Sequence, residues 1–141
     1  MTDAGCIFCR MVAGEVPVTG IWENESVLAF LDIAPISTGH TLVIPKRHFA
    51  RLHECPADVL AEMAARAAAI GAAVKVSLGF DGYNVFCNNG RAAGQIVDHV
   101  HFHVVGRREG DKVFTRWRSG NYAEDEAGRV AEKIKKTLLT G

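Results

Sequence analysis

The sequence predicts an α+β domain, with a mainly antiparallel sheet of about five strands, one long helix and a C-terminal helix. Three observations support this class. Short apolar or alternating runs occur in pairs between turn residues. One long segment between them, Pro56–Leu78, has apolar residues at helical spacing. No repeat or linker divides the 141 residues, a length typical of a single domain spanning 1–141.

The individual elements follow from local patterns. The expected strands are Ile21–Glu23, Val27–Asp32, Thr41–Ile44, Tyr83–Cys87 and His99–Val105, the first two forming a hairpin that turns near Asn24 and Glu25. The expected helices are Cys6–Ala13, Pro56–Leu78 and about Asp125–Leu138.

The long helix has both start signals and a small-residue face. Pro56 fits the first helical position, and Asp58 suits the positive N-terminal end. Its small residues include Ala64, Ala68 and Gly71, and they permit close approach of a second element. This element is either the sheet of the same chain or the equivalent helix of a second copy.

Composition narrows the function classes. The 16 basic and 16 acidic residues balance, which argues against binding long nucleic acid by bulk charge. Basic residues interleaved with aromatic ones between Arg107 and Arg118 are more typical of solvated surface, so a nucleic-acid partner is unlikely. The N-terminus has no apolar run suited to a signal peptide or membrane helix, so we expect a cytoplasmic protein without a membrane partner. In a reducing compartment, Cys6 and Cys9 form a pair typical of a metal or redox site.

The segment His99–Val105 carries the strongest functional signal. In a strand, His99, His101 and His103 would share one face, with apolar residues on the other. Three imidazoles on one face need partners for their ring nitrogens, so they are unsuited to filling a core. Such a face suits a transition-metal site, acid–base catalysis, or attack of one imidazole on phosphorus.

This alternation resembles the signature of the histidine triad superfamily, in which histidines alternate with apolar residues. Cys6–Cys9 with Gly14–Pro17, Leu28–Ile33, Gly39–His48 and Asn88–Gln95 resemble further family segments in the same order. The resemblance covers residues 6–105, while 106–141 form an extension to which little carries over. The most similar subgroup is the zinc-containing microbial one, related to histidine triad nucleotide-binding proteins.

The resemblance implies a nucleotide hydrolase or nucleotidyl transferase that acts at the α-phosphate of a purine nucleotide derivative, as a phosphoramidase or a dinucleoside polyphosphate hydrolase. His101 would be the nucleophile that forms a covalent nucleotidyl-histidine. The other implied catalytic residues are His103, His40, Asn88 and Gln95. The implied nucleotide-binding residues are Ile21, Phe30, Leu31, Asp32, Ile33, Asn88, Gln95, Ile96, His101 and His103. Phe30 and Ile33 could also be plain core, and Asp32 a turn residue.

The resemblance also implies a structural zinc ion, held by Cys6, Cys9, His48 and His99. It further implies a homodimer, to which the small-residue face of the long helix could contribute.

Two alternative functions remain open: a metal-dependent, cupin-like enzyme that uses the histidines as ligands, and a nucleotide-binding regulator without significant turnover. The sequence also departs from many amine-releasing relatives, because Ile96 stands where they carry a hydroxyl residue. This departure leaves the leaving group undecided.

Overall fold

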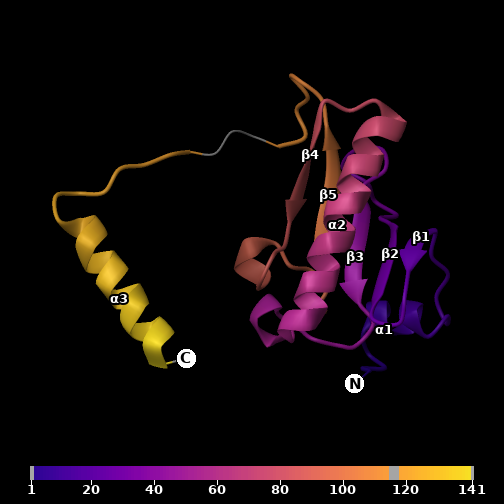
Figure 1. Cartoon of the computed structure of the whole chain (residues 1–141), viewed down its shortest axis with the longest axis horizontal. Helices are drawn as coiled ribbons and strands as arrows, with labels where there is room; N and C mark the ends of the chain where they lie inside the picture. Colours follow the sequence, from indigo (N-terminus) through magenta and orange to yellow (C-terminus); the bar gives the residue numbers. More distant parts are fainter. Residues whose placement is uncertain (1, 115–117, 141) are drawn as a thin grey trace.

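The computed structural model describes residues 2–114 and 118–140 and confirms the predicted α+β class (Figure 1). Five strands form one antiparallel sheet in the order β1-β2-β3-β5-β4. The strands are β1 (Gly20–Glu23), β2 (Val27–Leu31), β3 (Thr41–Pro45), β4 (Gly82–Phe86) and β5 (Phe102–Arg107). The helices are α1 (Ile7–Val12), α2 (Ala57–Leu78) and α3 (Glu126–Thr140), with short 3-10 turns η1 (Leu52–Glu54) and η2 (Arg91–Ala93).

Alternation along β2 and β3 divides the interior into two cores. Val27, Ala29 and Val43 pack beneath α2, and the intervening Leu28 and Leu42 pack on the other face, against α1. Both faces of the two strands are therefore buried, which explains their nearly continuous apolar sequences. The α1 face also carries the side chains of His101 and His103.

Helix α2 begins one residue later than predicted. Pro56 is its N-cap, with an extended ψ of 149°, so the first helical residue is Ala57. The helix ends at Leu78, and its C-cap is Gly79, whose φ of 68° favours glycine.

One of the small residues on α2 has a clear role within the chain. Gly71 is buried, and a Cβ atom there would lie 2.3 Å from the ring of Tyr83 in β4. Gly71 therefore allows α2 to pack closely on the sheet. Ala64 and Ala68 are exposed, so a helix contact with a second copy stays a prediction for that part of the face.

The last strand is shorter than predicted. The ladder between β3 and β5 reaches only the pair Val43–Phe102, so β5 begins at Phe102 instead of His99. The preceding residues run along a different segment, where the amide of Val100 donates to the carbonyl of Phe49 at 2.7 Å. Only His103 of the three histidines therefore lies within a regular strand.

Helix α3 stands apart from the sheet and from α2 (Figure 1). Together with residues 118–125 it lies on the β4 side of the sheet. Among the described residues, no helix is long and apolar enough to cross a membrane.

Candidate active site and metal centre

His101 is held in one tautomer by the main chain. Its Nδ1 lies 2.7 Å from the carbonyl oxygen of His99. A carbonyl can only accept, so Nδ1 carries the proton and Nε2 keeps a free lone pair. Phe8 packs edge-on against the His101 ring, with 5.2 Å between ring centroids. The imidazole, only 6% exposed, is therefore both oriented and prepared to act as a nucleophile.

His40 and His103 form a hydrogen-bonded chain beside His101. The main-chain amide of Ile36 donates to His40 Nδ1 at 3.2 Å, so the neutral His40 ring carries its proton on Nε2. His40 Nε2 lies 2.9 Å from His103 Nδ1 and donates to it. The proton of neutral His103 is then on Nε2. The fixed amide of Ile36 thus determines which nitrogen of His103 acts as a donor.

Burial keeps these three imidazoles neutral near pH 7. Burial, together with the neighbouring His101 and His40, lowers the pKa of His103 to about 4. Burial also lowers the pKa values of His40 and His101, although the carboxylate of Asp32 acts in the opposite direction on both. Neutral rings retain the lone pair that a nucleophile needs and the single N–H that a hydrogen-bond donor needs.

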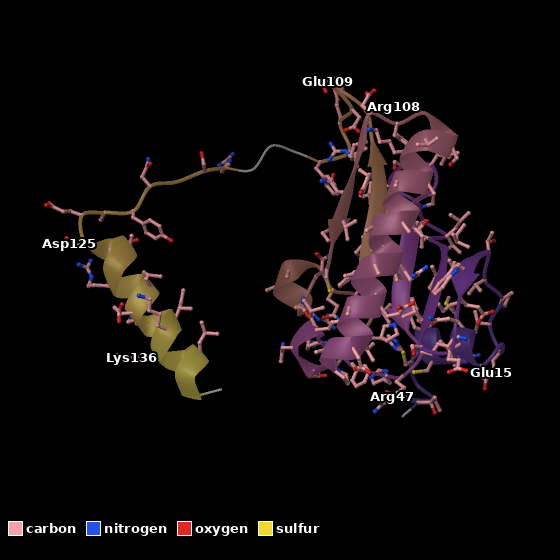
Figure 2. All side chains as sticks on the ribbon, in the orientation of Figure 1. Glu15, Arg47, Arg108, Glu109, Asp125 and Lys136 are labelled. Atoms are coloured by element: carbon pink, nitrogen blue, oxygen red, sulfur yellow. The ribbon has the colours of Figure 1, made fainter. Side chains whose placement is uncertain are left out.

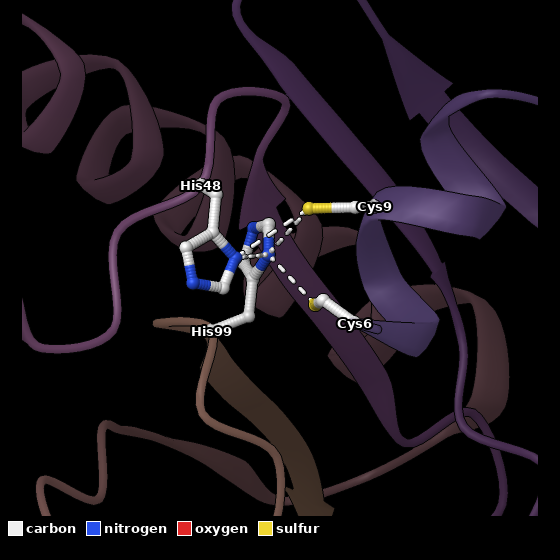
Figure 3. Close-up of side chains that lie close together, drawn as sticks. All are labelled: Cys6, Cys9, His48 and His99. Carbon is white, nitrogen blue, oxygen red and sulfur yellow. Dashed lines mark hydrogen bonds between the residues drawn. The ribbon is translucent and has the colours of Figure 1, made fainter. Parts of the chain in front are cut away.

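Cys6, Cys9, His48 and His99 converge at the junction of α1, β3 and the segment before β5 (Figure 3). His99 Nδ1 lies 3.4 Å from Cys6 Sγ, 3.6 Å from Cys9 Sγ and 3.2 Å from His48 Nδ1. Cys9 Sγ lies 3.5 Å from His48 Nδ1. In a tetrahedral zinc site, bond lengths of about 2.0–2.3 Å place the ligand atoms roughly 3.3–3.8 Å apart. These donor atoms therefore fit zinc without rearrangement.

The surroundings of this cluster also suit a metal. His99 Nε2 lies 2.8 Å from the carbonyl oxygen of Pro45, which fixes the proton there and leaves Nδ1 free to bind a metal. The amide of Asp3 donates a hydrogen bond to Cys9 Sγ at 3.3 Å. Burial, together with the neighbouring Cys9, raises the pKa of Cys6, so a cation at the cluster would be needed to hold that sulfur deprotonated.

A second group of candidate ligands, Asp32, His40 and His103, fits a metal poorly. Its shared atom would be His40 Nε2, which lies 3.7 Å from Asp32 Oδ2 and 2.9 Å from His103 Nδ1. A metal there would require the His40 proton to move to Nδ1, where it would face the N–H of Ile36. This group is therefore a hydrogen-bond chain, unlike the Cys6–His99 cluster.

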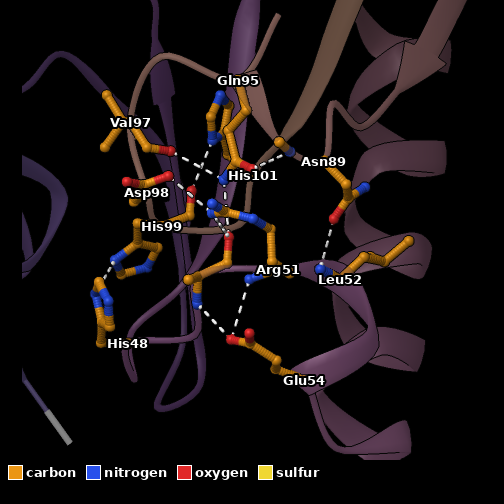
Figure 4. Close-up of polar contacts among 12 residues, drawn as sticks. His48, Arg51, Leu52, Glu54, Asn89, Gln95, Val97, Asp98, His99 and His101 are labelled. Carbon is orange, nitrogen blue, oxygen red and sulfur yellow. Dashed lines mark hydrogen bonds and ion pairs between the residues drawn. The ribbon is translucent and has the colours of Figure 1, made fainter. Parts of the chain in front are cut away.

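The loop between β4 and β5 is fastened by Gln95 (Figure 4). The Gln95 side chain is 4% exposed and accepts from the amide of Gly90 at 2.8 Å. Its amide nitrogen donates to the carbonyls of Ala50 and Val97 at 2.8 and 3.0 Å. The Gln95 side chain thus makes its hydrogen bonds within the protein, so only the main chain of residue 95 remains available to contact a phosphate. This bracing role was not part of the sequence prediction.

Two neighbours also support this loop. Asn89 accepts from the amide of Leu52 at 2.7 Å, and Arg51 pairs with Asp98 at 2.8 Å (Figure 4). By contrast, among the described residues the Asn88 side chain bonds only to the carbonyl of Gly94, at a long 3.5 Å, so it has bonding capacity left for a ligand. Ile96 is 93% exposed and is likewise not used by the core.

The residues predicted to hold a base are divided between the two faces of the sheet. Phe30 is buried on the face of His101 and packs edge-on against Phe8, with ring centroids 5.7 Å apart. Ile33 is 95% exposed and so is not core. Ile21 and Leu31 line a groove of about 360 Å³ together with α2 side chains, so the structure does not bring them to His101.

Asp32 has two partners at the end of β2. Its Oδ1 accepts from the amide of Ala34 at 2.8 Å, which is the turn role also considered for it. Its Oδ2 faces His40. Phe8 is an aromatic neighbour of His101 that the sequence prediction did not include. Its only signal was its position between Cys6 and Cys9.

Comparison with known proteins places this geometry in a family. The HIT domain family matches residues 13–110. An uncharacterised HIT-like protein of Methanocaldococcus jannaschii is 52% identical over 92% of this chain and 98% of its own length. An adenosine 5'-monophosphoramidase of Candida albicans is 38% identical over 97% of this chain and 93% of its own length.

Solved structures of relatives have the same fold as this chain. A Streptococcus mutans protein, 38% identical, superposes with a TM-score of 0.91 over 97% of this chain and 87% of that one. A zinc-bound histidine triad family protein from Mycobacterium smegmatis, 41% identical, superposes with a TM-score of 0.75 over 96% of each chain. Both have the same fold as the sheet and helices described above. The alternating histidines, the tautomer of His101 and these matches lead to one conclusion: the chain belongs to the HIT, or histidine triad, family.

Proposed function

We propose that this protein is a nucleotide hydrolase or nucleotidyl transferase that acts at the α-phosphate of a purine nucleotide derivative. The observation that carries the proposal is the 2.7 Å hydrogen bond from His101 Nδ1 to the His99 carbonyl. It leaves a lone pair on Nε2 of a buried, neutral imidazole.

In the proposed first step, His101 Nε2 attacks the α-phosphorus and the bond from phosphorus to the leaving group breaks. The leaving group takes the bonding electron pair and needs a proton. His103, whose Nε2–H follows from the bond donated by His40, can donate a hydrogen bond to the departing atom, and solvent supplies the proton. In the second step, water or another acceptor attacks the phosphorus and loses its proton to solvent. The P–N bond breaks with its electron pair on Nε2, and neutral His101 is restored.

The site offers groups for the rest of a nucleotide. Exposed Ile33 is the apolar side chain available to contact a base, while buried Phe8 and Phe30 pack beside His101. Apolar contacts do not select adenine or guanine. Asp32 Oδ2 can accept from ribose hydroxyls, and Asn88 has a free amide for a phosphate oxygen. The Candida albicans relative is named an adenosine 5'-monophosphoramidase, which supports an adenosine monophosphate derivative as a substrate.

Replacement of the nucleophile tests the mechanism. His101→Asn should abolish release of the leaving group from adenosine 5'-phosphoramidate, while nucleotide affinity changes little. Wild-type protein mixed with substrate and quenched in acid should show a nucleotidyl adduct on His101 by mass spectrometry. His53→Asn, an exposed histidine on η1, is the matched control and should retain full turnover. Normal turnover in His101→Asn would refute the mechanism.

Ile96 provides a test of leaving-group preference. An amine leaves poorly unless a proton reaches it, and isoleucine has no donor. We therefore expect phosphate or nucleotide leaving groups to be favoured over alkyl amines. Ile96→Ser should raise kcat/KM on amine-releasing substrates about tenfold to a hundredfold relative to phosphate-releasing ones, the effect of a single hydrogen bond of about 1–3 kcal/mol. If the ratio of kcat/KM between the two substrate types does not change, Ile96 does not set the leaving-group preference and another donor must protonate the amine.

We also propose that Cys6, Cys9, His48 and His99 hold a structural zinc ion, which places the chain in the zinc-containing subgroup. The tetrahedral fit of the donor atoms and the zinc-bound Mycobacterium smegmatis relative support this. A closed set of four protein ligands leaves no position for substrate, so the ion would tie α1 to the segment that carries His101. A cytoplasmic, reducing location would keep both cysteines available as ligands.

We further propose a homodimer, supported by the exposed Ala64 and Ala68 on α2 and by the open edge of β4. Light scattering at micromolar concentration tests it, because a monomer there would contradict the proposal. A cupin-like metal enzyme is less well supported, since the N–H of Ile36 at His40 Nδ1 opposes metal binding at the group of Asp32, His40 and His103. Measured turnover distinguishes an enzyme from a nucleotide-binding regulator.

A further inference from the structure

The ring of Phe86 stacks on the ring of His103. The two residues lie opposite each other in the antiparallel pair of β4 and β5, so their side chains share one face of the sheet. Their ring centroids are 4.6 Å apart, and the ring planes are inclined by only 13°. No functional role was predicted for Phe86 from the sequence, because a strand pattern does not reveal the neighbour across the ladder. The fold thus brings an aromatic ring into contact with a histidine of the candidate active site.

This stack supplies a restraint that the hydrogen bonds of the site do not. His40 Nε2 donates to His103 Nδ1 at 2.9 Å, which fixes one atom of the His103 ring but leaves the ring able to tilt about that bond. His101 meets the ring edge-on, with planes 62° apart. Among the described rings around His103, Phe86 is the one that lies nearly parallel to it, so this contact favours a single ring plane. The N–H bond of an imidazole lies in the ring plane, and the plane therefore sets the direction of Nε2–H.

A second aromatic ring and an ion pair hold Phe86 in place. Phe114 packs edge-on against Phe86, with ring centroids 5.6 Å apart. The guanidinium of Arg107 lies 4.9 Å from the centroid of the Phe114 ring, which is a cation–π distance. Asp111 fixes Arg107 through a 2.6 Å ion pair and accepts at 2.8 Å from the amide of Arg108, in the turn after β5 (Figure 2). This turn therefore supports the stack on His103.

The other nitrogen of His103 is available to a substrate. In the residues that the structure describes, no protein group is hydrogen-bonded to His103 Nε2, which carries the ring proton. The only buried side-chain nitrogen or oxygen without a partner in those residues belongs to Arg66, so His103 Nε2 is not sealed inside the protein. A donor that is aimed before the substrate arrives needs no reorganisation during the reaction. Its alignment matters, because a hydrogen bond weakens steeply as the angle at the hydrogen falls below about 120°.

We propose that Phe86 is a positioning residue, whose ring aims His103 Nε2–H at the atom that departs from phosphorus. The inference rests on the proposed function, in which that N–H donates to the departing atom. Charge develops on this atom only as its bond to phosphorus breaks, so a loss of alignment should slow the first step and leave nucleotide affinity nearly unchanged. The effect should be larger for amine than for phosphate leaving groups, because an amine depends more on a donor.

The test follows a single turnover of adenosine 5'-phosphoramidate by the full-length protein in excess over substrate. Phe86→Leu keeps an apolar side chain but removes the flat ring, and it should slow the first step about tenfold, less than the roughly 10²–10³-fold loss typical when a preorganised donor is removed entirely. Phe86→Tyr keeps the ring and should restore most of the rate. The matched control is Phe80→Leu, which removes a buried ring from the core beneath α2 and should leave the rate unchanged.

A double-variant cycle shows whether Phe86 acts through His103. His103→Ala removes the donor, so adding Phe86→Leu to it should cause no further loss in the rate of the first step. A spectroscopic readout is independent of turnover. The ring protons of His103 should shift in the nuclear magnetic resonance spectrum of Phe86→Leu, because the ring current of the stacked phenyl group is lost. Circular dichroism checks that each variant is folded at the assay temperature.

The outcomes separate this inference from the proposed function. An undiminished rate in Phe86→Leu, an equal loss in Phe80→Leu, or a further loss in the double variant would each overturn the positioning role. Unshifted His103 signals in Phe86→Leu would overturn the stack on which it depends. If wild-type protein shows neither turnover nor a nucleotidyl adduct, the proposed function itself is overturned, and the role of Phe86 in it falls as well.

Discussion

Gln95→Glu should destabilise the protein strongly although it changes only one amide to a carboxylate. Gln95 is 4% exposed, and its amide nitrogen donates to the carbonyls of Ala50 and Val97. A carboxylate cannot donate, so both carbonyls would lose this hydrogen bond and face a like charge. The carbonyl of Val97 would still accept from the amide of His99, and that of Ala50 from Arg51. The acceptor for the amide of Gly90 would remain.

The magnitude follows from the two lost bonds. A hydrogen bond contributes about 0.5–1.5 kcal/mol net, so the loss of two should lower the free energy of unfolding by about 1–3 kcal/mol. Protonation of the new carboxyl restores one donor, so the loss should shrink as the pH falls towards 5. Urea denaturation followed by circular dichroism at pH 7.5 and pH 5 measures both effects, each relative to wild-type protein at the same pH.

The matched control is Asn88→Asp, the same chemical change in the same loop. Asn88 makes only the 3.5 Å contact with Gly94, so its free energy of unfolding should change by about 0.5 kcal/mol or less. If both variants lose the same small amount of stability, the bracing role of Gln95 is refuted. Because Gln95 fastens the loop that leads to His101, kcat should fall in Gln95→Glu even where the protein is fully folded.

Two further predictions concern the metal and pH. Purified wild-type protein should contain about one zinc per chain, and Cys9→Ser should lose it and unfold at a lower denaturant concentration, because metal binding contributes to folding stability. Elemental analysis measures the zinc content, and Cys55→Ala, which removes another buried thiol, should keep the metal. Full zinc occupancy in Cys9→Ser would contradict the site. The pKa of His103 is about 4 in the folded protein and about 6.5 in the unfolded chain, so between these values only the unfolded chain binds a proton at this residue. The free energy of unfolding is therefore unaffected by His103 above pH 6.5. It falls by up to about 1.4 kcal/mol per pH unit as the pH is lowered towards 4. Denaturation in excess zinc should therefore show a steeper fall between pH 6.5 and pH 4.5 in wild-type protein than in His103→Asn, and equal slopes would refute the assignment.

The sequence by itself determined the α+β class, the hairpin that turns at Asn24, the extent of α2 to within one residue, and the single face shared by His101 and His103. These features depend on neighbours a few positions apart, because the period of a strand or helix is written into the local pattern. Pairing of Cys6 with Cys9 was also visible, since two ligands three residues apart lie within one helical turn.

Only the tertiary structure decided which atoms of these residues can react. The carbonyl of Pro45 leaves Nδ1 of His99 for a metal, and the amide of Ile36 makes His40 a donor. It also brought Phe8 to His101, left Ile21 on the α2 face and separated α3 from the sheet. The physical reason is distance along the chain. A hydrophobic period reports the face on which a side chain lies, whereas a tautomer depends on the one main-chain group that folding places beside each ring nitrogen.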